Sequence, residues 1–156
     1  MNDALKSEDP VSIAGAISDL LAADPANIQA LEVGLEIAKY NKAPELMRQM
    51  FDMVPMSGLS GDKAEKFASM LISDSSFTYR YPEAAMKFAE YAFKKDPENS
   101  GYINTYARLL YCLGDLEDAL TWQEKAVKLD PNNKTYQDNL NYCISIKTLR
   151  PGNKKN

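Results

Sequence analysis

Apolar residues recur along most of the chain at three- and four-residue intervals, the spacing that places side chains on one face of an α-helix. Ile103, Ala107 and Leu110 show this spacing clearly. No segment alternates apolar and polar residues as a run of half-buried strands would. The pattern predicts an all-α protein of about eight helices, which would span residues 10–23, 27–40, 44–54, 61–74, 82–95, 99–113, 116–129 and 133–147.

Proline marks the start of several of these segments. Pro44 and Pro82 each begin an apolar-periodic stretch, where the missing N–H of proline would have no helical partner in any case. The predicted connections are short, so we expect successive helices to pack antiparallel.

A four-residue motif, Asp-Pro-x-Asn, occurs at residues 24–27, 96–99 and 130–133. The second and third copies are 34 residues apart, and Ala85 and Ala92 align with Ala119 and Ala126 at the same offset. Proline disfavours the helical conformation of the residue before it, and the asparagine side chain can cap the helix that follows. The motif therefore predicts a repeat of two helices and a turn.

The interval from the first proline of the motif to the second is 72 residues, which is four more than two units of 34. An insertion of five residues within 75–80 and a deletion of one residue near 56–58 would account for the difference. Phe77 and Tyr79 in the insertion, with nearby Tyr81, either pack on the adjoining helices or form a second contact site.

These features resemble the tetratricopeptide repeat family, most closely over residues 61–133. The family places a large residue before a small one in the first helix of each unit, as in Tyr106-Ala107 and Phe67-Ala68. The segment 10–60 matches less well, because Gly34-Leu35 has the reverse order. Gln123 stands where the family prefers an aromatic residue, and Trp122 lies next to it.

The resemblance implies a right-handed α-α superhelix in which the first helix of each pair lines a concave surface that binds peptides or protein segments. The family's ligand-facing positions fall on Glu32, Glu36, Tyr40, Asn104, Arg108, Tyr111, Asp138 and Tyr142. The lysines and asparagines with which some members hold a chaperone's C-terminal carboxylate are not visible here. Glu32 and Glu36 would instead suit a basic or mixed-charge peptide.

Both ends of the repeat domain, predicted at 10–147, need explanation. Helix 10–23 precedes a copy of the motif, so it resembles the second helix of a pair whose first helix is missing. Either this helix is itself a cap, or the chain is cut from a longer protein. Helix 133–147 is expected to act as a cap, with Leu140 and Ile144 inward and Asp138, Asn139 and Asn141 outward. Residues 1–9 are expected to be disordered, and 148–156 to form a flexible basic tail.

Charge and composition exclude several kinds of function. The net charge is −4, and residues 147–156 contribute four positive charges and no negative one, so the remainder carries −4 − 4 = −8. An acidic body repels phosphate backbones, and we expect no nucleic-acid binding. No apolar run approaches the length of a membrane span, and residues 1–10 lack the pattern of a signal peptide.

The chain has no histidine, the commonest general base and metal ligand. Its two cysteines, Cys112 and Cys143, lack the spacing of a zinc or redox motif, and we expect them to be packed thiols rather than a disulfide. We therefore expect neither catalysis nor a cofactor or metal site.

The leading hypothesis is a protein-interaction module or scaffold that binds a peptide or protein segment. One alternative is the C-terminal arm of a larger enzyme, for example a thioredoxin-like bacterial protein. Another is a structural homo-oligomer that stacks through its N-terminal end. The sequence leaves the compartment open between the cytoplasm and, for a fragment of a secreted chain, the bacterial periplasm.

Overall fold

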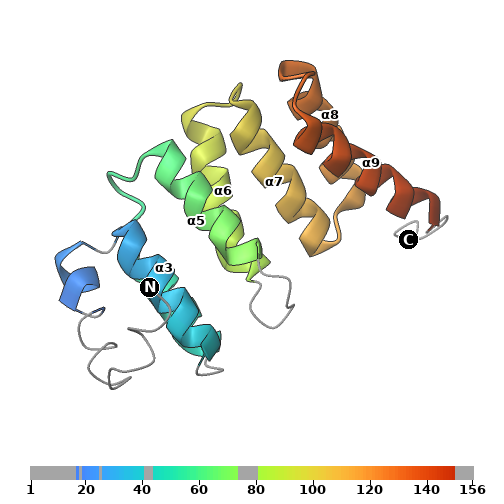
Figure 1. The fold of residues 1–156 in the computed structure, drawn as a ribbon. Helices are drawn as coiled ribbons and strands as arrows, with labels where there is room; N and C mark the ends of the chain where they lie inside the picture. Colours follow the sequence, from blue (N-terminus) through green and yellow to red (C-terminus); the bar gives the residue numbers. More distant parts are fainter. Residues whose placement is uncertain (1–16, 18, 25, 41–43, 74–80, 150–156) are drawn as a thin grey trace. The chain divides into compact units, whose positions relative to one another are not determined.

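The computed structural model describes residues 17, 19–24, 26–40, 44–73 and 81–149. Within them every regular element is helical, so the predicted all-α class is confirmed. Residues 19–23, inside the predicted first helix 10–23, are helical, and 10–16 lie outside the described part. The longer helices are α3 (Ile28–Tyr40), α4 (Pro44–Asp52), α5 (Gly61–Ile72), α6 (Pro82–Lys95), α7 (Ser100–Leu113), α8 (Leu116–Leu129) and α9 (Lys134–Leu149), as labelled in Figure 1.

The chain forms two compact units. The N-terminal unit is Met1–Leu59 with Ser76–Tyr79, and the C-terminal unit is Ser60–Ser75 with Arg80–Asn156.

In the N-terminal unit, α3 packs against α4 around the fully buried side chains of Leu31 and Phe51. Gly34 is the small residue at this contact, because a Cβ atom on it would lie 2.8 Å from the sulfur of Met50 on α4. The large-small pair of this unit is thus Val33-Gly34, which begins one residue earlier than Gly34-Leu35.

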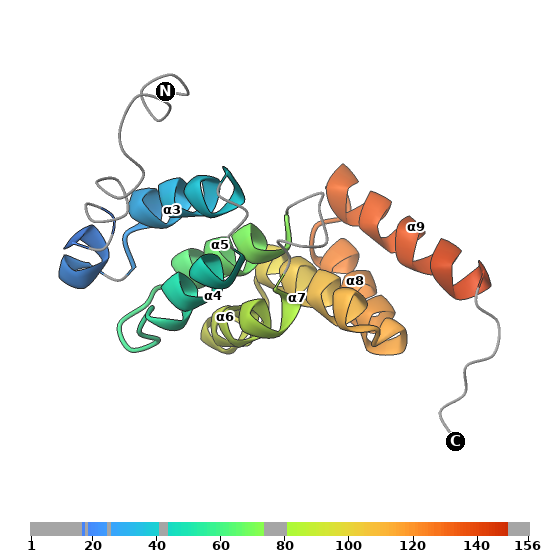
Figure 2. The same ribbon diagram turned by 90° about the horizontal axis from the view of Figure 1, so that it is seen from below.

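In the C-terminal unit, α5 packs against α6 and α7 against α8, while α6 contacts α7 and α9 contacts both α8 and α7. Figures 1 and 2 show α5, α7 and α9 on one side and α6 and α8 on the other. Alanines with no exposed surface allow the helices to approach closely, namely Ala64, Ala68, Ala85, Ala92, Ala119 and Ala126.

The repeated motif has the role that the sequence predicts for it. The side-chain oxygens of Asn27, Asn99 and Asn133 accept hydrogen bonds from backbone N–H groups in the first turns of α3, α7 and α9. The aspartates contribute as well, since Asp24 and Asp96 each accept from the N–H two residues later and so fix the turn. Gly114, with a φ of 89°, ends α7 by donating its N–H to carbonyls of the last turn.

The C-terminal helix differs from its prediction in two respects. It ends at Leu149 rather than 147, so the first two residues of the predicted tail are helical. Its inward face is also different, because Cys143 is buried and Asn139 and Leu140 are half-buried, while Ile144 is 47% exposed.

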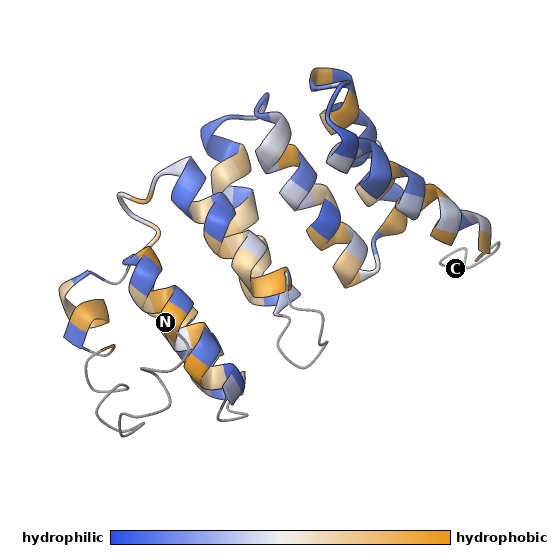
Figure 3. Cartoon of the chain, viewed as in Figure 1, coloured by the Kyte–Doolittle hydropathy of each residue, from blue (hydrophilic) through white to orange (hydrophobic). Residues whose placement is uncertain are grey.

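The inward placement of Ile144 was therefore wrong, and so was the outward placement of Asn139. Ile144 follows Leu110 by 34 residues, and Leu110 packs inside a complete helix pair. No described helix follows α9 to cover Ile144 in the same way. In Figure 3, hydrophilic and hydrophobic residues are interspersed along this helix.

None of the described helices combines the length and the apolar character that crossing a membrane would require.

Candidate functional site

The first helices of the C-terminal unit, α5, α7 and α9, are joined near their starts by polar side chains. The hydroxyl of Tyr102 on α7 donates a 2.6 Å hydrogen bond to the carboxylate of Asp62 on α5. Its ring occupies the space beside Gly61, where a Cβ atom would lie 2.7 Å from the phenolic oxygen. The bond to Asp62, together with burial, raises the pKa of Tyr102 to about 12, because both disfavour the phenolate.

One turn farther along the same helices, Glu65 on α5 accepts a 2.6 Å hydrogen bond from the hydroxyl of Thr105. The same carboxylate oxygen accepts a 2.8 Å bond from Ser69, four residues later on its own helix. The carboxylate of Glu65 is therefore stabilised by two hydrogen bonds from within the protein.

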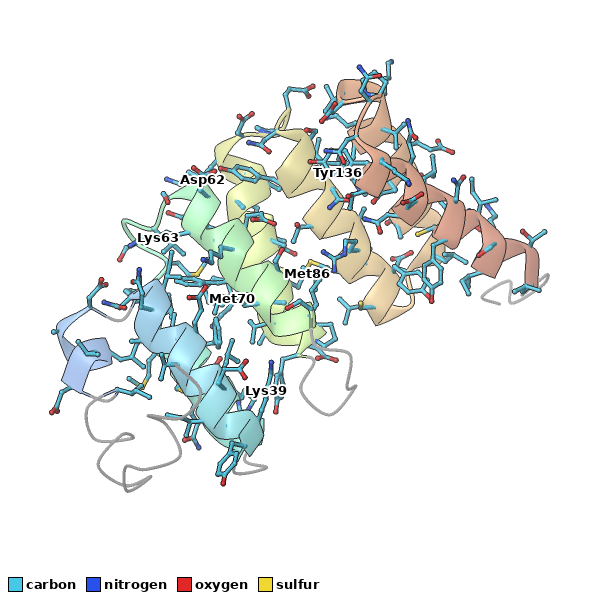
Figure 4. The ribbon with its side chains drawn as sticks, viewed as in Figure 1. Lys39, Asp62, Lys63, Met70, Met86 and Tyr136 are labelled. Carbon is cyan, nitrogen blue, oxygen red and sulfur yellow. The ribbon has the colours of Figure 1, made fainter. Side chains whose placement is uncertain are left out.

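A buried amide network joins α7, α8 and α9. Gln123, 1% exposed, donates from Nε2 to the Oδ1 atom of Asn104 and to the backbone carbonyl of Tyr136, both at 3.1 Å. Asn139 donates to the same Asn104 oxygen at 2.9 Å. Figure 4 shows Tyr136 where α9 begins beside α7, and Asp62 at the start of α5.

Asn104 was expected to face a ligand, but the structure corrects that assignment. The residue is 7% exposed, and its side-chain oxygen already accepts two hydrogen bonds. The side chain of Asn104 points toward α8 and α9, where its oxygen accepts hydrogen bonds from Gln123 and Asn139. We call this set of internally bonded residues the hydrogen-bonded band; it comprises Asp62, Glu65, Tyr102, Asn104, Thr105, Gln123 and Asn139.

Beyond this band, three side chains form a more accessible patch, which we call the open band: Arg108, Tyr111 and Tyr142. The hydroxyls of Tyr111 on α7 and Tyr142 on α9 are 3.1 Å apart, with Tyr111 donating, and the rings meet edge to face at 5.2 Å. Tyr142 is 54% exposed. Arg108 is half-buried and stands three residues before Tyr111, which places both on the same side of α7.

The remaining candidate of this unit, Asp138, is exposed on α9 one turn before Tyr142. Within the described part of the chain, neither Asp138 nor Arg108 forms an ion pair. The structure thus brings Tyr111 and Tyr142 together, with Arg108 and Asp138 flanking them on their respective helices.

The other three candidates belong to the N-terminal unit. Glu32, Glu36 and Tyr40 are all exposed on α3, and their four-residue spacing puts them on one side of that helix. Glu36 accepts a 3.3 Å bond from Lys39, and Tyr40 is 76% exposed. They form a separate candidate surface.

An aromatic cluster joins α6, α7 and α8 and explains the unusual glutamine. Phe93 stacks on Tyr106 at 5.5 Å, and Trp122 meets both rings edge-on at 5.0 and 5.9 Å. Burial, then the nearby carboxylates, Glu90 foremost, raise the pKa of Tyr106. Trp122 thus supplies the aromatic packing of α8. The neighbouring Gln123 does not take part in that packing and forms the hydrogen bonds of the amide network.

The two cysteines do not form a disulfide; Cys112 is exposed on α7 and Cys143 is buried on α9. Burial, and secondarily the proximity of Cys112, raise the pKa of the Cys143 thiol, which makes it less reactive. The described residues contain no cluster of three potential metal ligands. Phe77 and Tyr79 of the insertion lie outside the described residues, and Tyr81 is half-buried at the start of α6.

A comparison with family models matches residues 101–133 to the tetratricopeptide repeat. Residues 101–133 are therefore similar to a tetratricopeptide repeat. The matched segment contains α7, α8 and the turn between them, which carry most of the amide network and the open-band residues Arg108 and Tyr111. A comparison with curated protein sequences finds no match.

Two solved tetratricopeptide structures have a similar fold. The crystal structure of MamA is 17% identical, with a TM-score of 0.55, and the alignment covers 88% of this chain and 80% of that one. The structure of YrrB, described as a TPR protein with an unusual peptide-binding site, is 16% identical with a TM-score of 0.57, and covers 90% and 72%. The tetratricopeptide-type fold predicted from the sequence is thereby confirmed.

No residue of α5 was among the binding positions predicted from the sequence, although Asp62 and Glu65 bind α7. The large-small pairs provide a signal that would have found one of them. Glu65 stands two residues before Phe67, just as Asn104 stands two residues before Tyr106. Gln123 was noted as a departure from the family, but only the structure shows what it binds.

Proposed function

We propose that this protein is an interaction module that binds an extended peptide or protein segment across its first helices. In the C-terminal unit the binding surface is the open band, with Asp138 at its edge. The observation that carries the proposal is the tyrosine pair of half-buried Tyr111 and exposed Tyr142, which lies beside an arginine without an ion-pair partner among the described residues. Tyrosine and arginine are the residues most often found at the energetic centres of protein interfaces.

The hydrogen-bonded band supports this surface without contacting the ligand. Its side chains use their polar atoms on one another, which fixes α5, α7 and α9 relative to each other. A surface that is rigid before binding loses less conformational entropy when the ligand arrives.

Glu32, Glu36 and Tyr40 are proposed as a second contact surface on α3, suited by its charge to a basic stretch of the same or another partner. The proposal includes no catalysis, cofactor or nucleic-acid binding. The family match and both structural relatives are tetratricopeptide proteins, so they lend no support to the alternative of an enzyme arm.

The test is a quantitative capture experiment with the double variant Arg108→Ala/Tyr111→Ala. Proteins retained by the immobilised wild-type chain should be lost with this variant, while its helical circular dichroism is unchanged. The matched control is Lys128→Ala/Leu129→Ala, which removes a cationic and an apolar side chain from the exposed surface of α8. If the double variant retains the same proteins as the control, the binding surface lies elsewhere.

A further inference from the structure

The charged side chain of the open band, Arg108, differs from the nearby carboxylates of α5 because its charged group has no hydrogen-bond partner among the described residues. On α5, Asp62 and Glu65 accept hydrogen bonds from Tyr102, Thr105 and Ser69, so these carboxylates are already engaged. Arg108 has no such engagement, because it forms neither a hydrogen bond nor an ion pair with any described residue. The other arginine that the structure describes, Arg48, is bound by both Glu45 and Asp52.

The tyrosines beside Arg108 are held in one arrangement. The 3.1 Å bond between their hydroxyls and the edge-to-face contact of their rings restrict the rotation of Tyr142 about its side-chain bonds. Tyr142 nevertheless leaves 54% of its surface accessible. A fixed, half-exposed ring offers a flat apolar surface on which another ring can stack with little loss of entropy.

We propose that the open band selects a segment in which a carboxylate side chain stands next to an aromatic side chain. The carboxylate pairs with the guanidinium of Arg108, whose planar fork matches two carboxylate oxygens. The aromatic ring packs against Tyr142. This inference rests on the proposed function and adds to it the chemistry of the ligand.

Asp138 is a charged group beside the open band that opposes this preference. It lies one turn before Tyr142 on α9, and it forms no ion pair with Arg108. Its charge weakens the attraction for an acidic segment without cancelling it, because Asp138 is exposed and water screens it. Asp138→Asn should therefore tighten binding of an acidic segment about twofold.

The test uses four short peptides with acetylated and amidated ends, which remove the terminal charges. Their central residues are Glu-Phe, Gln-Phe, Lys-Phe and Glu-Ala, between Gly-Ser spacers. Each is titrated into the full-length chain, and binding is followed by the NMR shifts of the Arg108, Tyr111 and Tyr142 amides. We expect the Glu-Phe peptide to bind about fivefold more tightly than the Gln-Phe and Glu-Ala peptides, the scale of one accessible ion pair or one stacked ring.

Arg108→Gln should reduce binding of the Glu-Phe peptide to that of the Gln-Phe peptide and leave the Gln-Phe peptide unaffected. Lys128→Gln, on the exposed surface of α8, is the matched control and should change neither. If Arg108→Gln does not fold, as judged by circular dichroism, the wild-type comparison of the four peptides decides alone.

Equal binding of the Glu-Phe and Gln-Phe peptides, or tighter binding of the Lys-Phe peptide, would overturn the inference about charge. The proposed function would survive either result, because the peptides would still bind at the open band. Absence of shifts with all four peptides would also overturn the inference. The capture experiment with Arg108→Ala/Tyr111→Ala would then decide the proposed function independently.

Discussion

The hydrogen-bonded band and the open band share helices α7 and α9, yet their polar groups are used in opposite ways. In the hydrogen-bonded band, Asn104 and Gln123 are almost fully buried and bonded to one another. In the open band, Tyr142 is half-exposed and Arg108 has no ion-pair partner among the described residues. The residues of the hydrogen-bonded band stabilise the surface, whereas those of the open band remain available for binding. The two sets nevertheless occupy neighbouring positions of the repeat.

The largest expected effect on stability comes from removing the centre of the amide network. Asn104→Leu keeps the approximate size of the side chain but leaves donors of Gln123 and Asn139 without their acceptor. The cost of such an unsatisfied buried group is about 1–3 kcal/mol, so the free energy of unfolding in urea should fall by that amount. Asp138→Leu, at the exposed equivalent position on α9, is the control and should change stability by less than about 0.5 kcal/mol.

A double substitution sharpens this prediction. Asn104→Leu/Gln123→Leu removes the donor together with its acceptor, so it should cost less than the sum of the two single changes. Strict additivity in urea unfolding would show that the two amides do not act as a pair.

The second effect is a pH dependence carried by Tyr102. Its pKa is about 12 in the folded protein, above the usual value of 10.0 for tyrosine, because Asp62 and burial disfavour the phenolate. The stabilisation from this group is thus fully present below pH 10 and is lost as the pH rises from 10.0 toward 12.

Thermal unfolding across this pH range, compared between the wild type and Tyr102→Phe, measures the effect. Alkaline titration of the lysines is common to both proteins and cancels in the difference. The wild type should lose more stability than the variant between pH 10 and 12, and parallel curves would contradict the assignment.

A smaller effect is expected where Tyr102 contacts Gly61. Gly61→Ala would bring a methyl group within 2.7 Å of the phenolic oxygen and displace the ring from Asp62, at a net cost of about 1 kcal/mol. Gly101→Ala is the matched change on α7, where a Cβ atom would lie 3.6 Å from the phenolic oxygen of Tyr136 and 3.2 Å from the cap oxygen of Asn99. Urea unfolding should show that the first substitution is the more destabilising of the two; equal effects would mean that the tyrosine contact is unimportant.

The smallest effect on stability belongs to the open band. Tyr142→Ala removes a half-exposed ring and one solvent-accessible hydrogen bond, so the unfolding free energy should change by about 0.5 kcal/mol or less. The same substitution should abolish the preference for the Glu-Phe over the Glu-Ala peptide. A large loss of stability would place Tyr142 with the structural residues and remove the distinction between the two bands.

Most of the fold followed from local rules in the sequence. Each predicted helix from residue 27 onward occurs within a few residues of its expected ends, because helical periodicity and capping are properties of neighbouring residues. Asn27, Asn99 and Asn133 cap the helices expected of them. The repeat spacing also placed Tyr106-Ala107 and Phe67-Ala68 correctly, since Ala107 and Ala68 are buried where small residues were expected.

The candidate site could be predicted only in part. Arg108, Tyr111, Asp138 and Tyr142 are accessible, as repeat position suggests, but Asn104 is not. The repeat fixes which side of a helix a residue occupies. It does not determine whether a neighbouring helix supplies a partner for that residue, as Gln123 and Asn139 do for Asn104.

The sequence by itself determined the helices, their caps and the two-helix repeat, because these depend on residues within one or two turns of one another. The tertiary structure alone decided that Tyr102 bonds Asp62, that Gln123 joins three helices, and that Ile144 is left exposed at the last helix. Those contacts join residues that are far apart in the sequence or depend on whether another helix follows. A hydrogen bond between side chains of different helices depends on how those helices are placed relative to one another. Local sequence patterns do not determine that placement.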